Sequence, residues 1–153
     1  MKKFELTSEF ITNIFGTKLF RIKALIEFGN VKAGELGGFT EKEENLSQDG
    51  NAWVYDNARV YGDACVCGDA RVCGDACVYG DAGYATVHGF GSEYRTTTFF
   101  KTKAGDIGVK CGCFYGNLSE FRKKVVETHG ETKKAKEYLM LADLMEFRFS
   151  DNS

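Results

Sequence analysis

A six-residue repeat between Gly50 and Ala85 constrains what this chain can fold into more than any other feature. Written in sixes, the segment reads GNAWVY, DNARVY, GDACVC, GDARVC, GDACVY and GDAGYA. A period of six residues fits neither the 3.6-residue turn of an α-helix nor the two-residue alternation of a simple strand. Self-similarity at a fixed period is typical of repeat architectures, in which each unit stacks on its neighbours. We call residues 50–85 the hexad segment.

Residue size within each hexad predicts which side chains point inward. Valine recurs at every sixth position over most of the segment, and alanine recurs two residues before it. Valine favours short strands because it is β-branched, and alanine suits a position where a larger side chain would crowd the interior. The Gly/Asp and Asp/Asn pair that opens the hexads supplies a tight bend. The predicted interior residues are Val54, Val60, Val66, Val72 and Val78, with Ala52, Ala58, Ala64, Ala70, Ala76 and Ala82.

The hexads resemble the repeat of left-handed β-helices, in which an aliphatic residue is followed four positions later by a small one, as Val60 is by Ala64. They are similar, more specifically, to YdcK-type β-solenoids, whose repeats read NARVYGNA. The similarity extends from about Phe20 to Tyr84. It implies a mainly β fold, a left-handed β-helix whose triangular coils each contain three hexads. Proteins of this type often look phage-encoded, which implies a phage protein here.

Three hexads per coil would stack residues that are eighteen positions apart. Trp53 is then expected to lie over Arg71 as a cation–π pair, and Tyr61 over Tyr79. Two degenerate hexads, in residues 38–49, extend the repeats towards the N-terminus. The expected parts of the chain are an N-terminal β cap over residues 1–37, a hexapeptide β-solenoid over residues 38–88 and a C-terminal unit over residues 89–153.

The two ends of the chain carry ordinary strand and helix signals. An N-terminal hairpin is expected to cover the open edge of the first repeat. In the C-terminal part, Asn117 followed by Glu120 has the spacing of a capping box, and Gly130 is a helix stop. The expected N-terminal elements are strands at residues 10–12 and 18–26. The expected C-terminal elements are a hairpin of strands 94–103 and 107–115 and helices at residues 118–128 and 133–146, and these two strands and two helices form a small ββαα unit.

Composition and charge limit the classes of function. The chain has 153 residues, is 43% hydrophobic and has a net charge of −2. Residues 41–83 carry nine acidic and three basic side chains, whereas residues 84–153 carry nine acidic and eleven basic ones. An acidic repeat region argues against nucleic-acid binding, and an anionic ligand should prefer the C-terminal part. Neither a membrane-spanning apolar run nor a signal sequence is recognisable, so we expect a cytoplasmic protein, in the host cell if phage-encoded, without membrane contact.

The six cysteines are predicted to be free thiols. Four lie in the hexad segment at positions that never stack on one another, and Cys111 and Cys113 are alternate residues of one strand, too far apart for easy bridging. The sequence contains no zinc-ligand spacing, Walker motif, dinucleotide fingerprint or serine-nucleophile motif. We therefore expect no metal and no cofactor.

His88 is the candidate for a catalytic base. Hexapeptide β-helices are best known as acyltransferases, and the resemblance implies a histidine that deprotonates the acceptor beside acyl-CoA, bound between subunits of a trimer. The other histidine, His129, is expected at a helix C-terminus, where its charge favours the helix dipole. A general base needs an orienting partner and a substrate pocket, and no long loop leaves the repeats to build one. The sequence therefore favours a protein without catalysis.

An anion could be held by the strand that follows the hexads, YRTTTFFKTK. Its hydroxyl and basic side chains can donate hydrogen bonds to phosphate, and an aromatic ring there can stack on a base. The simpler alternative is an ordinary strand, since threonine is a good strand former and the basic residues would be solvated. The candidate ligand-binding residues are Tyr94, Arg95, Thr97 and Lys101, with Arg59 and Arg71 on the hexads as a second surface.

Three functions stay open on this basis. The first is a non-enzymatic oligomeric protein that binds a small anionic or nucleotide ligand; if the protein is from a phage, it could be an anti-defence sponge that sequesters a nucleotide immune signal. The second is a hexapeptide-repeat acyltransferase that uses acyl-CoA and His88. The third is a structural or assembly role. Aromatic side chains on the hexad faces and the resemblance both favour a homo-oligomer, with a trimer expected.

Overall fold

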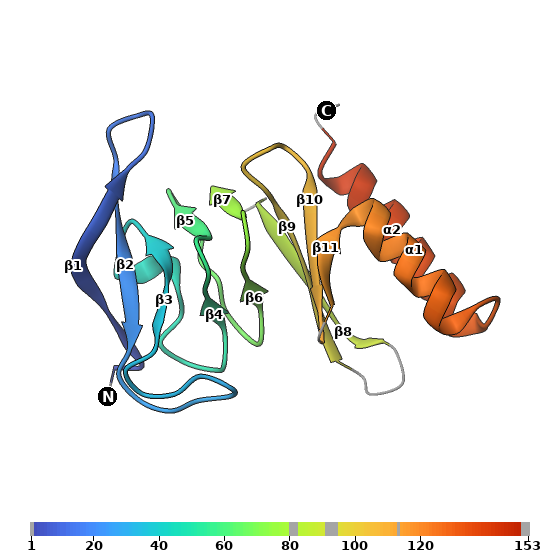
Figure 1. Cartoon of the computed structure of the whole chain (residues 1–153), viewed down its shortest axis with the longest axis horizontal. Helices are drawn as coiled ribbons and strands as arrows, with labels where there is room; N and C mark the ends of the chain where they lie inside the picture. The colour runs from blue at the N-terminus through green and yellow to red at the C-terminus, as the bar shows by residue number, and fades with distance from the viewer. Residues whose placement is uncertain (1, 80–82, 91–94, 113, 151–153) are drawn as a thin grey trace.

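The computed structural model describes residues 2–79, 83–90, 95–112 and 114–150. Its first strands, β1 (Phe4–Thr12) and β2 (Lys18–Ala24), form an antiparallel hairpin, which confirms the predicted N-terminal hairpin. The turn is fixed by Asn13, whose Oδ1 accepts hydrogen bonds from the backbone N–H groups of Phe15 and Thr17 at 2.9 and 3.0 Å. Figure 1 shows this hairpin at one end of an elongated molecule and two helices at the other.

The hexads form short parallel strands that belong to two sheets. The larger sheet has the strand order β1-β2-β3-β5-β7, in which β2 and β3 are antiparallel and the pairs β3–β5 and β5–β7 are parallel. The smaller sheet is the parallel pair β4–β6. The bounds are β3 (Leu36–Thr40), a 3₁₀ turn η1 (Glu43–Asn45), β4 (Trp53–Val54), β5 (Arg59–Tyr61), β6 (Arg71–Val72) and β7 (Cys77–Tyr79).

The pairs β4–β6 and β5–β7 have the predicted register of eighteen residues. Trp53 is paired with Arg71, and Tyr61 with Tyr79, whose ring centroid lies 5.2 Å from that of Tyr61. The Trp53 ring packs edge-on against Phe28, with centroids 5.3 Å apart. The expected cation–π contact between Trp53 and Arg71 is not among those formed by the described residues. The register was therefore predictable, and the partner of the indole ring was not.

The small and β-branched residues of the hexads do form the interior. Val54, Val60, Val66, Val72 and Val78 are fully buried, and Ala52, Ala58, Ala64, Ala70 and Ala76 are at most 2% exposed. Ala82 lies outside the described residues. Strand β3 approaches this interior so closely that a Cβ on Gly38 would lie 2.6 Å from the carbonyl oxygen of Ala58. A larger residue at position 38 would push the two strands apart.

The C-terminal part is a four-stranded antiparallel sheet with two helices on it (Figure 1). The first helix begins at Asn117, which forms the predicted capping box with Glu120, and Gly130 follows its end with a φ of 61°. Phe99, Phe121 and Tyr138 join a second hydrophobic core here. Neither helix is long and apolar enough to cross a membrane, as far as the described residues go. The elements are β8 (Tyr84–Phe90), β9 (Arg95–Lys101), β10 (Ile107–Cys111), β11 (Phe114–Asn117), α1 (Leu118–His129) and α2 (Lys133–Arg148).

The predicted left-handed β-helix is wrong, and so is the description of the chain as a hexapeptide β-solenoid with a ββαα unit. The described strands are divided between separate mixed, parallel and antiparallel sheets, and they do not close into a helix. The hexad of residues 62–67, between β5 and β6, forms a single isolated bridge, from Val66 to Leu46, instead of a strand. Strand β8, which includes the end of the hexad segment, pairs with β9 along most of its length. This antiparallel ladder satisfies more backbone groups than one more short parallel pair would.

The predicted division of the chain into parts at residues 37 and 88 stays a prediction. Strand β8 runs from Tyr84 to Phe90 and so continues across the second of these positions. The isolated bridge between Ala76 and Thr102 and the hydrogen bond from the Arg71 N–H to Oγ1 of Thr98 also join the hexads to the C-terminal sheet. These contacts position the candidate site described below.

Ala70→Leu is expected to destabilise the protein, because Ala70 is fully buried in the hexad interior. A larger side chain there would overpack the space between neighbouring strands, at a cost of ~1–3 kcal/mol. Thermal denaturation followed by circular dichroism measures the effect as a lower melting temperature. Ala33→Leu is the matched control, since Ala33 is exposed. Equal melting temperatures for Ala70→Leu and the wild type would contradict the interior assignment.

Candidate functional site

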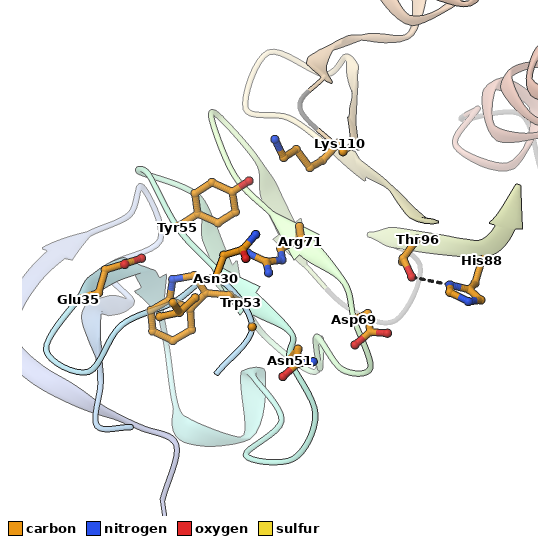
Figure 2. A pocket seen from close by; sticks show the side chains of 13 residues that line it. Asn30, Glu35, Asn51, Trp53, Tyr55, Asp69, Arg71, His88, Thr96 and Lys110 are labelled. Carbon is orange, nitrogen blue, oxygen red and sulfur yellow. Dashed lines mark hydrogen bonds between the residues drawn. The ribbon is translucent and has the colours of Figure 1, made fainter. Parts of the chain in front are cut away.

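A groove of about 580 Å³ lies where the hexads meet the C-terminal sheet. Its walls come from three places: the segment that precedes β3, the pair β4–β6, and strands β8, β9 and β10 of the C-terminal sheet. Figure 2 shows side chains from these elements converging on it. We call it the Arg71 groove. The residues on which the argument depends are Asn51, Trp53, Tyr55, Arg71, His88 and Lys110.

Two basic side chains line the groove, Arg71 from β6 and Lys110 from β10. Within the described part of the chain, neither is ion-paired with a carboxylate. The backbone N–H of Arg71 donates to Oγ1 of Thr98 at 3.0 Å. Its guanidinium lies against Gly29, where a Cβ would come within 3.2 Å of Nη2. The backbone of Arg71 is therefore fixed by a hydrogen bond, and one side of its guanidinium contacts Gly29. No described carboxylate neutralises its charge.

The charge of Arg71 affects several neighbouring groups. Burial, as the main cause, and Arg71 both lower the pKa of Lys3, whereas Asp49 opposes them. Burial raises the pKa of the Cys73 thiol, and Asp56 adds to that rise, whereas the hydrogen bond with Tyr55 and the positive charges of Lys110 and Arg71 oppose it. Charges of both signs therefore act on the groups around Arg71.

The indole of Trp53 forms part of the groove wall although only 1% of this residue is exposed. Its Nε1–H is buried and has no hydrogen-bond partner in the described structure. A buried donor without a partner costs about 1–3 kcal/mol. An acceptor atom that reached this N–H would recover that free energy. Trp53 therefore contributes its ring to the groove wall, while its N–H lies buried without a partner among the described residues.

Acidic side chains also line the groove, so it is not uniformly positive. Figure 2 shows Glu35 and Asp69 on either side of Arg71, and Lys110 extending from the opposite wall towards Tyr55. Carboxylates accept hydrogen bonds from hydroxyl and amino groups, but they repel phosphate. The arrangement suits a ligand with an anionic part at Arg71 and Lys110 and with donor groups elsewhere.

His88 lies at the edge of the groove and is exposed. Its Nδ1 is hydrogen-bonded to Oγ1 of Thr96 at 2.9 Å, as the dashed line in Figure 2 marks. The described residues place no carboxylate in hydrogen-bond contact with this imidazole. A hydroxyl can orient the ring, but it stabilises an imidazolium less than a carboxylate does. His88 therefore has a groove and an orienting group, and it has no acidic partner among the described residues.

Most of the other predicted ligand-binding residues do not reach the groove. Arg59 lies on β5, in the five-stranded sheet. Thr97 is fully buried, and its hydroxyl donates to Sγ of Cys111 at 3.3 Å. Lys101 is half-buried at the end of β9. Of the residues proposed from the sequence, the structure thus brings together Arg71 and His88.

Two further predicted residues fall partly or wholly outside the structural description. Tyr94 lies outside the described residues, and Arg95 is described by its backbone alone, at the start of β9. The backbone of Arg95 pairs with Phe90 of β8. Their proposed ligand-binding roles stay predictions.

Sequence reasoning missed Lys110, which lies 39 positions after Arg71 in the chain. A signal for it was present, because strict alternation in the strand IGVKCGCFY places Lys110 on the opposite face from the buried Val109. Its approach to Arg71 depends on the pairing of Lys110 with Thr98, whose hydroxyl binds the Arg71 backbone. The pairing belongs to the hairpin that was expected, but the hydrogen bond from Arg71 to Thr98, which joins two sheets, could not be inferred from the repeat.

Comparison with known proteins gives one partial similarity. No model of a protein family matches the chain. A stretch of 63 residues is 40% identical to the uncharacterized acetyltransferase YdcK of Escherichia coli (strain K12). The match covers 37% of this chain and 19% of that protein, so the chain spans about a fifth of the length of this curated relative. The similarity supports a distant relationship to that protein.

Cysteine reactivity should follow burial rather than proximity to the groove. Cys65 and Cys67 are exposed, whereas Cys73 is buried, with a pKa raised by burial. Because the thiolate is the reactive form, iodoacetamide at neutral pH is expected to modify Cys65 and Cys67 first and Cys73 only after unfolding. Mass spectrometry of peptides after timed labelling measures the order. Early modification of Cys73 would contradict its burial.

Proposed function

We propose that this protein binds a small phosphate-bearing ligand in the Arg71 groove and does not transform it. The observation that carries the proposal is the convergence of Arg71 and Lys110, from two different sheets, on one groove where no described carboxylate pairs with either. Buried or half-buried cations without a counter-ion are costly unless an anion reaches them. A phosphate group would supply that anion.

The remainder of the groove suits the rest of such a molecule. The indole of Trp53 adds an aromatic ring to the groove wall. Asn51 and Asp69 line the same groove and can bind hydroxyl groups of a sugar or polyol. Tyr55 adds an aromatic surface. These groups favour a phosphorylated small molecule over free inorganic phosphate.

The chemistry of the groove does not single out a nucleotide immune signal among phosphate-bearing molecules, and neither the groove nor the E. coli relative supports a phage origin. The proposal is therefore limited to the chemical class of the ligand.

The predicted homotrimer also stays a prediction. The argument for it from aromatic side chains on the hexad faces is weaker than the sequence suggested, because Trp53 is buried within the chain and Tyr55 is half-buried. Tyr79 is the most exposed of these aromatic side chains.

Arg71→Ala and Lys110→Ala are each expected to weaken binding of ADP-ribose, used as a phosphate-bearing probe, by about tenfold to a hundredfold. The reason is the loss of a charge-assisted hydrogen bond worth ~1.5–3 kcal/mol. Isothermal titration calorimetry measures the dissociation constants, with pyrophosphate and cyclic nucleotides as further probes. Arg59→Ala is the matched control, since it removes an arginine of the hexads that does not line the groove. If the wild type binds none of the probes, or if Arg59→Ala weakens binding as much as Arg71→Ala, the proposal is wrong.

Acyl transfer is the second candidate function, and the partial match to a protein named as an acetyltransferase favours it. In that case His88 would take a proton from an acceptor hydroxyl or amine while the acceptor attacks the thioester carbonyl of an acyl-CoA, and the CoA thiolate would leave. The hydrogen bond from Thr96 would orient the imidazole. The lack of an acidic partner among the described residues is the reason to rank this function second.

A thiol-release assay with acetyl-CoA and a panel of amine and hydroxyl acceptors separates the two functions. If the protein binds its ligand without catalysis, CoA thiol is expected to be released no faster with the protein than without it. Release that is abolished by His88→Ala, reduced by Thr96→Val and retained in Arg59→Ala would overturn the non-catalytic proposal. The comparison is informative because His88 and Thr96 line the groove, and Arg59 does not.

A further inference from the structure

A second pocket, of about 460 Å³, lies between the tip of the β1–β2 hairpin and the pair β5–β7. It shares no lining residue with the Arg71 groove. Figure 1 shows the hairpin tip on the same side of the molecule as the labelled ends of β5 and β7. We call it the aromatic pocket. The residues on which the argument depends are Asn13, Phe15, Glu41, Tyr61 and Tyr79.

Three aromatic side chains line this pocket although they belong to exposed parts of the fold. Tyr61 and Tyr79 are paired across β5 and β7, with ring centroids 5.2 Å apart and ring planes at 41°. Phe15 is 78% exposed and Tyr79 66%. Large apolar side chains left in water gain nothing for the fold. Their gathering around one cavity is typical of a binding surface.

Phe15 is held in place rather than left on a loose loop. The Asn13 side chain accepts hydrogen bonds from two backbone N–H groups of the turn, and the Asn13 N–H donates to the Thr17 carbonyl at 3.0 Å. The Gly16 N–H donates to the Asn13 carbonyl, also at 3.0 Å. These bonds fix the backbone that carries Phe15, so that ordering of the turn costs little conformational entropy on binding.

The charge of the aromatic pocket is negative. Glu41 lines it, and its Oε1 accepts a hydrogen bond from the Gly62 N–H at 2.9 Å, which fixes the carboxylate in position. None of the described lining residues is a lysine or an arginine. Arg59, two residues before Tyr61 on β5, is a charged neighbour outside the lining. The pocket therefore combines three aromatic rings with one carboxylate.

We propose that the aromatic pocket binds a small organic cation of the alkylated ammonium class. A cation over the face of a tyrosine or phenylalanine ring is attracted by the ring quadrupole, and the Glu41 carboxylate adds to this attraction. Alkylated ammonium ions fit apolar walls because they lose less hydration on entry than a bare ammonium or metal ion. Choline is the simplest probe of this class. The inference is independent of the phosphate site, with which this pocket shares no side chain.

The first test compares choline with 3,3-dimethyl-1-butanol, which has the same shape and no charge. Proton NMR titration of each compound with the protein measures binding. The methyl resonance of choline is expected to move upfield, because in the proposed complex the methyl groups lie over aromatic rings. The neutral compound is expected to bind more weakly than choline, by a factor of about five or greater. Equal binding of the two compounds would overturn the proposal and indicate an apolar contact surface for another protein or a second copy of this chain. Absence of choline binding would overturn it as well.

The second test uses variants with a matched control. Glu41→Gln keeps an acceptor oxygen for the Gly62 N–H and removes the charge, and Tyr79→Leu removes a ring. Each is expected to weaken choline binding about fivefold without changing the melting temperature greatly. Phe147→Leu is the control, because Phe147 is an aromatic residue of α2 with the same exposed fraction as Phe15, 78%, and lies outside the pocket. Unchanged choline affinity in both Glu41→Gln and Tyr79→Leu, or an equal loss in Phe147→Leu, would contradict the proposal.

Discussion

The eighteen-residue register of the short parallel strands is the constraint on which the rest of this structure depends. Strands of two or three residues are too short to be stable alone, so each must satisfy its backbone groups on a neighbour. The backbone N–H of Trp53 donates to the Ala70 carbonyl at 3.1 Å, and the backbone N–H of Arg59 donates to the Ala76 carbonyl at 2.9 Å. A shift of one residue would break these bonds and would turn the repeat valines outward.

The same register builds the Arg71 groove, because side chains that flank an inward valine lie on the outer side of the ladder. Trp53 and Arg71 occupy equivalent positions in β4 and β6, each directly before a buried valine. The segment before β3 then folds over them: Phe28 packs edge-on against Trp53, and Gly29 lies against the Arg71 guanidinium. A polar site thus arises beside an interior of repeat valines and alanines, through the alternation of side chains along a strand.

The sequence predicted local features well, and it failed where separate parts of the chain meet. Hexad spacing predicted the buried valines and the pairing of Tyr61 with Tyr79, and capping chemistry predicted the start of α1. The closed left-handed β-helix was wrong, because six-residue spacing indicates where side chains point without requiring continuous strands on every side. For the site, Arg71 and His88 were identified, whereas Lys110 was missed because its place beside Arg71 depends on the contact of the C-terminal sheet with β6, which the hairpin signal alone does not indicate.

The two cavities show how one register supports two different chemistries. Pairs at the same separation place an indole with a guanidinium in β4–β6, and two phenol rings in β5–β7. The difference is set by which variable residue each hexad carries and by what the neighbouring chain adds: Gly29 and Lys110 at the groove, Phe15 and Glu41 at the aromatic pocket. The separation of folding from binding is incomplete, because Trp53 flanks a buried valine and is itself part of the buried core. Arg71 and Tyr79 also flank buried valines, but they are left half-buried or exposed and so are available for binding.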